Sequence, residues 1–240
     1  MIFENYLDEI SAVLGKIKDT QKDKIASAAE MVAKTIKNDG IVYIFGCGHS
    51  HLIALDCFYR AGGLANVSAM LDTDLMLHNG AAKSSKMERM SGIAESIFAR
   101  YCITEKDVLI TVSTSGKNAV PCEMAAAASK AGVPNISVVS GAYFDDKTVG
   151  KKLYECSDMY IDNCVPHGDA VMPISGTDVK MGSVSTAASS FILQSVLLEA
   201  AEIAAKDGTD LPIYKSGNVD GGAEYNEALI KKYLPRIKHL

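Results

Sequence analysis

The sequence predicts a three-layer α/β domain built on a parallel sheet, and the order of its apolar runs is the reason. Short apolar runs of strand length recur along the chain, and segments of helical length separate them. The runs are 41–45, 108–112, 136–139 and 159–161, with a weaker candidate at 66–71. Continuous apolar runs are typical of strands that are buried on both faces. Alternation of such strands with helices predicts a parallel sheet with right-handed crossovers.

Apolar residues at helical spacing predict the helices around this sheet. We expect helices at 51–62, 86–101, 118–131 and 185–205. The last is Ala-rich and apolar on most sides, which predicts a helix covered by the domain or by a partner subunit. Residues 1–39 predict a helical N-terminal extension, with Thr20 as an N-cap between two helices. Because no repeat or linker is present, 1–240 is interpreted as a single domain that ends in a loop-rich tail, 208–240.

The composition excludes several classes of protein. The chain has 240 residues, of which 48% are hydrophobic and 22% charged, and its formal net charge is −5. A net negative surface repels polyanions, so we expect no nucleic-acid partner. No run approaches the roughly 18 apolar residues of a transmembrane helix. The first segment carries Glu4, Asp8 and Glu9 where a secretory signal is basic and then apolar, so we expect a cytoplasmic protein with no membrane partner and reduced cysteines.

Three clusters rich in glycine and hydroxyl residues lie where a helix is expected to begin. They are 46–51, 113–118 and 182–186. Ligands of open α/β sheets bind at the carboxyl ends of the strands. Helix N-termini there offer unpaired N–H groups and a partial positive charge, which suit a single phosphate. Each hydroxyl is alternatively a simple N-cap, but three clusters at one sheet edge favour a phosphate site.

Two other ligand classes fit these residues less well. Gly46 and Gly48 after a strand, with Asp72 after the next, partly match a dinucleotide-binding pattern, but His51 stands where a third glycine is needed. The phosphate-binding loop G-x-x-x-x-G-K-[ST] is absent. Histidines 49, 51, 78 and 167 lack ligand-pair spacing, so we expect no metal and no cofactor.

Two segments resemble the sugar isomerase (SIS) domain family, and within it the phosphoheptose isomerases. They are 46–50, GCGHS, and 107–116, DVLITVSTSG. The tail segment 218–226 resembles an uncharacterised bacterial branch of the family. The resemblance implies a flavodoxin-like sheet of five parallel strands, a homodimer or homotetramer, and a sugar phosphate as the small-molecule ligand.

The resemblance also implies which side chains bind the ligand. The phosphate would be held by Ser50, Ser113, Thr114, Ser115 and Asn118, with Ser185 and Thr186 closing the site. The expected sugar contacts are Gly48, His49 and Asp169, although Asp169 is alternatively a loop cap.

The chain departs from its resemblance at the catalytic positions. Arg60 stands ten residues after Ser50, where phosphoheptose isomerases and N-acetylmuramic acid 6-phosphate etherases carry a catalytic Glu. Asp56 stands where some phosphoheptose isomerases carry a metal-binding His, and 185–205 contains no His. The implied fold and phosphate site carry over, but the catalytic groups do not.

Two residues are candidates for the missing acid–base group. Glu88 is expected near the start of a helix at the carboxyl edge, where an apolar pocket would raise its pKa toward neutrality. The alternative is a capping box, Ser85-x-x-Glu88, with no catalytic role. His78, in the polar connection 72–84, titrates near neutral pH and would assist ring opening, unless it is a surface residue.

The residues therefore favour an enzyme that acts on a phosphorylated sugar, most simply an aldose–ketose isomerase. One alternative is a lyase or etherase that acts on an amino-sugar phosphate with Glu88 as the base. The other is a non-catalytic phosphosugar sensor, which Arg60 at the expected Glu position favours.

Overall fold

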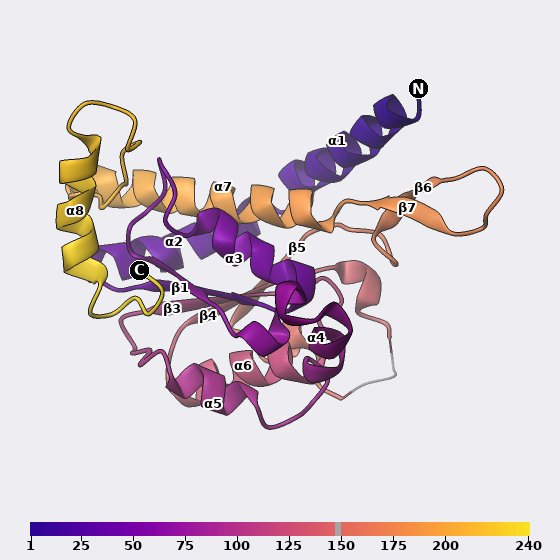
Figure 1. Ribbon diagram of the computed structural model, residues 1–240, viewed down its shortest axis with the longest axis horizontal. Helices are drawn as coiled ribbons and strands as arrows, with labels where there is room; N and C mark the ends of the chain where they lie inside the picture. Colours follow the sequence, from indigo (N-terminus) through magenta and orange to yellow (C-terminus); the bar gives the residue numbers. More distant parts are fainter. Residues whose placement is uncertain (147–149) are drawn as a thin grey trace.

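The computed structural model describes residues 1–146 and 150–240 and contains a sheet of five parallel strands (Figure 1). The strand order is β2-β1-β3-β4-β5, the flavodoxin-like order. The strands are β1 (Val42–Gly46), β2 (Val67–Met70), β3 (Val108–Val112), β4 (Asn135–Val139) and β5 (Met159–Asp162). Each predicted run thus forms a strand, which confirms the predicted α/β fold.

Helices cover both faces of the sheet, because successive strand residues point to opposite sides. Val42, Ile44 and Ile110 point into one apolar core, and Tyr43 and Phe45 into the other. The first core is covered by α1 (Ile2–Thr20), α2 (Lys22–Lys37), α3 (His51–Cys57) and α7 (Ser185–Lys206). The second is covered by α5 (Ala94–Ala99), α6 (Ala119–Lys130) and α8 (Gly222–Tyr233), while α4 (Ala81–Met87) lies by the carboxyl edge.

Helix α7 is the long apolar helix that the sequence predicts. By length and composition alone α7 could cross a membrane. The sequence analysis did not predict this, because polar residues interrupt the helix and no unbroken apolar run of about 18 residues occurs. In the fold, however, α7 runs beside α2 and places Ile192, Leu193 and Val196 in the core. Its other side leaves Leu198 68% exposed. We therefore interpret α7 as a core helix with one uncovered stripe.

Several predicted boundaries are wrong. The segment 86–101 is not one helix, because α4 ends at Met87 and α5 begins only at Ala94, with Gly92 at φ 93° between them. Helix α3 ends at Cys57, since Phe58 is extended. Thr20 is not the cap of α2; Gln21 holds that position, and the Thr20 hydroxyl donates to the Lys16 carbonyl at 2.7 Å.

The C-terminal tail is more ordered than predicted. It contains α8, and polar contacts attach it to the rest of the fold: Arg236 pairs with the buried carboxylate of Asp107 at 2.7 Å, and His239 contacts the Tyr101 hydroxyl at 2.9 Å. The hairpin of β6 (Ala170–Pro173) and β7 (Lys180–Ser183) is also absent from the prediction. Figure 1 shows that this hairpin and the start of α1 project beyond the sheet at the same end.

Candidate functional site

The loop after β1 folds tightly against its own strand. Gly46 has no room for a side chain, because a Cβ there would lie 2.6 Å from the Ser50 carbonyl group. Gly48 has φ 55°, which favours glycine. The Ser50 amide donates to the Cys47 carbonyl at 3.0 Å. These constraints turn Ser50 back over the carboxyl end of the strand, where it is half-buried.

The loop after β3 is organised by hydrogen bonds of its own residues. Ser113 is buried, and its hydroxyl accepts from the Gly116 amide at 3.3 Å. The Thr114 carbonyl accepts from the Ser140 amide at 2.9 Å, which joins this loop to the one after β4. Ser115 is half-buried in the same turn, and Asn118 is the N-cap of α6. Ser113 is thus partly used to shape the turn that presents Thr114 and Ser115.

Asp169 holds the start of α7. One carboxylate oxygen accepts from the Val184 and Ser185 amides at 2.9 and 2.8 Å, and the other accepts from the Ser185 hydroxyl at 2.7 Å. This is the loop-capping role that the sequence left open beside sugar binding. The Asp169 carboxylate also takes two of the N–H groups that a phosphate would otherwise use, which leaves Ser183 and Thr186 as the exposed hydroxyl residues of this cluster.

A small cavity brings members of all three clusters together. Its volume is about 20 Å³, which holds a group the size of one water molecule and suits one part of an anion. The lining residues are His49, Ser50, Ile53, Val112, Thr114, Ser185, Thr186 and Ser189.

The sequence analysis missed Ser189, which lines this cavity, and Asn163, which contacts two of its lining residues. Asn163 is fully buried, and its side-chain amide lies 3.4 Å from the Thr114 hydroxyl and 3.3 Å from the Ser189 hydroxyl. Because it follows β5 directly, its place at the carboxyl edge was a signal that could have identified it. Asn163 connects the loop after β3 to α7 and so fixes the distance between two walls of the cavity.

Glu88 lies close to both the β1 and the β3 loops. It receives a hydrogen bond from the Asn118 side chain. Burial raises the pKa of the Cys47 thiol, and the charges of Glu88 and Asp72 add to this. Its backbone carbonyl accepts from the Val120 amide at 3.1 Å. The Glu88 side chain is 18% exposed, and burial raises its pKa, while Arg89 and the Asn118 hydrogen bond lower it.

The expected place of Glu88 near the start of a helix is wrong, and the capping box that the sequence offered as an alternative role is not formed. Glu88 follows the end of α4 instead of beginning a helix, and the Ser85 hydroxyl accepts from Arg89 at 2.8 Å. The Glu88 carboxylate is therefore not used to cap a helix start.

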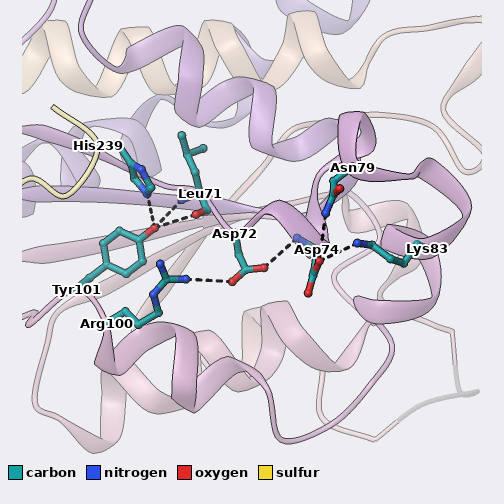
Figure 2. Close-up of polar contacts among 8 residues, drawn as sticks. All are labelled: Leu71, Asp72, Asp74, Asn79, Lys83, Arg100, Tyr101 and His239. Carbon is teal, nitrogen blue, oxygen red and sulfur yellow. Dashed lines mark hydrogen bonds and ion pairs between the residues drawn. The ribbon is translucent and has the colours of Figure 1, made fainter.

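The loop after β2 carries His78 and is anchored by side chains at its base (Figure 2). The Leu71 amide donates to the Tyr101 hydroxyl at 2.7 Å, and Asp72 pairs with Arg100 at 3.6 Å. Asp74 accepts from Lys83 at 2.7 Å and from Asn79 at 3.2 Å. Figure 2 shows these contacts side by side along the loop.

The two histidines proposed from the sequence, His49 and His78, are both exposed. His51 between them is buried, its Nδ1 contacts the Gly48 carbonyl, and its ring meets that of His78 edge-on with centroids 6.0 Å apart. Among the described residues, no group of three or more His, Cys, Asp or Glu side chains is arranged to hold a metal ion.

Comparison with known proteins decides the family. The sequence model of the SIS domain matches residues 5–140. The chain belongs to the SIS-domain family. It is 40% identical to the UPF0309 protein of Listeria innocua over 98% of this chain and 97% of the relative, and 40% identical to a UPF0309 protein of Caldanaerobacter subterraneus, with 98% of each covered.

Solved structures agree with this assignment at the level of fold. A phosphoheptose isomerase of Francisella tularensis superposes with a TM-score of 0.58 at 14% identity, covering 83% of this chain and 96% of the other. That of Neisseria gonorrhoeae gives 0.53 at 15% identity, covering 83% and 97%. At such identities the likeness to this SIS-domain protein is one of fold.

In this SIS-domain protein, the two departures from the phosphoheptose isomerase pattern contact each other. Arg60 forms an ion pair with the Asp56 carboxylate and donates to the Asp56 carbonyl at 2.8 Å. Asp56 also accepts from Gln194 of α7 at 3.0 Å. The pair therefore connects the end of α3 to α7.

Proposed function

We propose that this SIS-domain protein binds a sugar phosphate at the carboxyl edge of the sheet and interconverts its aldose and ketose forms. One observation carries the proposal: hydroxyl groups from three separate segments line one cavity, and a shielded carboxylate, Glu88, lies beside the same loops. Hydroxyls of Ser50, Thr114 and Thr186 supply hydrogen-bond donors for the phosphate without a basic surface.

Glu88 is the proposed base. Isomerisation requires removal of the proton at C2 of the open-chain aldose, formation of an enediol, and return of a proton to C1. A carboxylate whose pKa is raised by burial is closer to the working pH, which suits transfer in both directions. His78 is the proposed partner for ring opening, because its loop is anchored beside the same edge.

The test is incubation with aldose phosphates of five to seven carbons in D₂O, followed by NMR for deuterium at C2. We expect exchange with at least one sugar and a loss of about 10²–10⁴-fold in Glu88→Gln. Lys206→Gln, on the exposed end of α7, is the matched control and should exchange like the parent chain. Absence of exchange with every sugar contradicts an isomerase, and release of lactate from N-acetylmuramic acid 6-phosphate would instead indicate a lyase.

A non-catalytic phosphosugar sensor is the second candidate, and the Asp56–Arg60 pair favours it. Both side chains stand at positions where the resemblance implies catalytic or metal-binding groups, yet here they join α3 to α7. A sensor would be stabilised thermally by a sugar phosphate without turnover, and Glu88→Gln would not change that stabilisation. Turnover by the parent chain would exclude this candidate.

We also propose a homo-oligomer, either a dimer or a tetramer. The projecting end of α1 and the β6–β7 hairpin expose Phe3, Leu7, Val179 and Met181, which are each at least 59% exposed. Exposed apolar side chains gathered on a projection are typical of subunit contacts.

A cytoplasmic location is proposed on the evidence of the cysteines. All six are free thiols, and four of them are buried. Free thiols in this number suit a reducing compartment.

A further inference from the structure

A broad groove of about 650 Å³ lies next to the candidate site. It is bordered by α6, by the connection between α4 and α5, and by residues 150–156. Asn118 lines the groove and also donates a hydrogen bond to Glu88, so the groove opens beside the proposed base. The small cavity is too narrow for a sugar, whereas this groove has room for the rest of a ligand.

Three cationic side chains line the groove in a protein that is negatively charged overall. Arg89, Lys117 and Lys151 line it, and they come from three separate segments of the chain. Among the lining residues, all of them in the described part of the chain, Glu123 is the one acid, and one of its oxygens accepts from the Gly92 amide at 2.8 Å. Asp146 and Glu88 do not line the groove, but they pair with Lys117 and Arg89, so the groove attracts an anion through the donors that these pairs leave and not through a net positive charge.

Two of these cations are held in place by neighbouring groups. Lys117 pairs with Asp146 at 3.0 Å and lies 5.8 Å from the centre of the Tyr143 ring. Arg89 donates to the Ser85 hydroxyl at 2.8 Å and lies 3.4 Å from the Glu88 carboxylate. A lysine ammonium has three donors and an arginine guanidinium five, so these contacts leave donors for a ligand.

We propose that the groove binds a second anionic group of the substrate, so that the ligand is a sugar phosphate that also carries a carboxylate or a second phosphate. This inference rests on the proposed function, in which the hydroxyls that line the small cavity hold the first phosphate. Lys117 and Arg89 bind the second anion and thereby orient the carbon chain past Glu88.

Calorimetric titration with two matched pairs of ligands tests the inference. Glucose 6-phosphate is compared with 6-phosphogluconate, which adds a carboxylate, and fructose 6-phosphate with fructose 1,6-bisphosphate, which adds a phosphate. We expect the more highly charged member of at least one pair to bind about tenfold more tightly, and the pair concerned identifies the second anion. The advantage should shrink with added salt, because it arises from charge.

Substitutions in the groove separate this inference from the proposed function. Lys117→Gln and Arg89→Gln should each remove most of the tenfold advantage while the monophosphate binds as before. Lys117→Arg should retain the advantage, and Lys206→Gln, outside the groove, should change nothing. If monophosphates bind and the second anion adds no affinity, or if both ligands weaken equally in the variants, the inference is wrong and the proposed function stands. If no sugar phosphate binds at all, both are wrong.

Discussion

At the scale of single residues, Glu88 combines burial with a nearby charge. Burial raises its pKa, and Arg89 and Asn118 only partly offset this. The same shielding that suits a base therefore disfavours the charged carboxylate and has a cost in stability whenever Glu88 is ionised. Active-site groups commonly carry such a cost, because their environment serves the reaction and not the fold.

Glu88→Gln should make the unliganded protein more stable at neutral pH. A raised pKa means that the folded state binds the Glu88 proton more tightly than the unfolded chain does. Stability is thus full below the unfolded pKa of about 4.3 and declines as pH rises through the raised folded pKa. Gln remains neutral, so the gain in melting temperature should be larger at pH 7.5 than at pH 4.

The matched control for this prediction is Glu227→Gln. Glu227 is 64% exposed on α8 and pairs with Lys231 at 3.1 Å, so its substitution removes a carboxylate of the same kind from a solvated position. We expect a smaller difference between the two pH values there. Equal changes in melting temperature at both pH values for Glu88→Gln would show that burial does not control its ionisation.

At the scale of elements, the turn from β1 into α3 depends on Gly46. A Cβ at this position would meet the Ser50 carbonyl group at 2.6 Å and the Ser50 Cβ at 2.9 Å. Gly46→Ala should therefore destabilise the fold by about 1–3 kcal/mol and weaken phosphosugar binding, because the backbone of Ser50 must move. Chemical denaturation and calorimetric titration measure the two effects.

Gly15→Ala is the contrasting substitution. Gly15 lies inside α1, and a Cβ there meets nothing within 4 Å, so we expect a gain of about 0.5–1 kcal/mol from helix propensity and unchanged binding. If Gly46→Ala behaved in the same way, the close approach of Ser50 to the strand would not be a constraint on the site.

The start of α7 depends on the carboxylate of Asp169, which accepts its first hydrogen bonds. Asp169→Ala removes the acceptor of two backbone amides and one hydroxyl, and we expect a loss of about 1–2 kcal/mol even without ligand. Urea denaturation of the unliganded protein measures this loss. Unchanged stability together with weaker ligand binding would instead favour the sugar-binding role predicted from the sequence.

At the scale of the whole molecule, an arm projects beyond the five-stranded sheet (Figure 1). The arm consists of the start of α1 and the β6–β7 hairpin, which contact each other where the Tyr6 hydroxyl donates to the Ser183 carbonyl at 2.6 Å. Because β7 leads directly into α7, a subunit contact made by the arm would also affect the start of that helix.

The combined variant Phe3→Ser, Val179→Ser should therefore dissociate the proposed oligomer into monomers, since it removes two exposed apolar side chains of the arm. Light scattering coupled to size-exclusion chromatography gives the mass. Val219→Ser, which replaces a side chain that is 52% exposed outside the arm, should leave the mass unchanged. A monomeric parent chain would contradict the prediction.

Local patterns explain why the core of the fold could be predicted. The five strands follow from apolar runs such as 108–112, and the glycines at 46 and 48 mark the turn because only their backbone fits it. Helix limits were harder to predict, since 86–101 is interrupted by a turn around Gly92 that helical periodicity does not reveal. The hairpin was missed because β6 and β7 are only four residues long each, and one buried residue, in β6, gives no apolar pattern that predicts a strand.

By itself, the sequence determined the sheet, the hydroxyl-rich loops at its carboxyl edge and the resemblance to the SIS family, because each is encoded by neighbouring residues. Only the tertiary structure decided that Asp169 caps α7, that Asn163 joins two walls of the cavity and that Glu88 lies beside Asn118. These contacts join residues 15 to 49 positions apart in the chain, so they form only when the strands and helices pack.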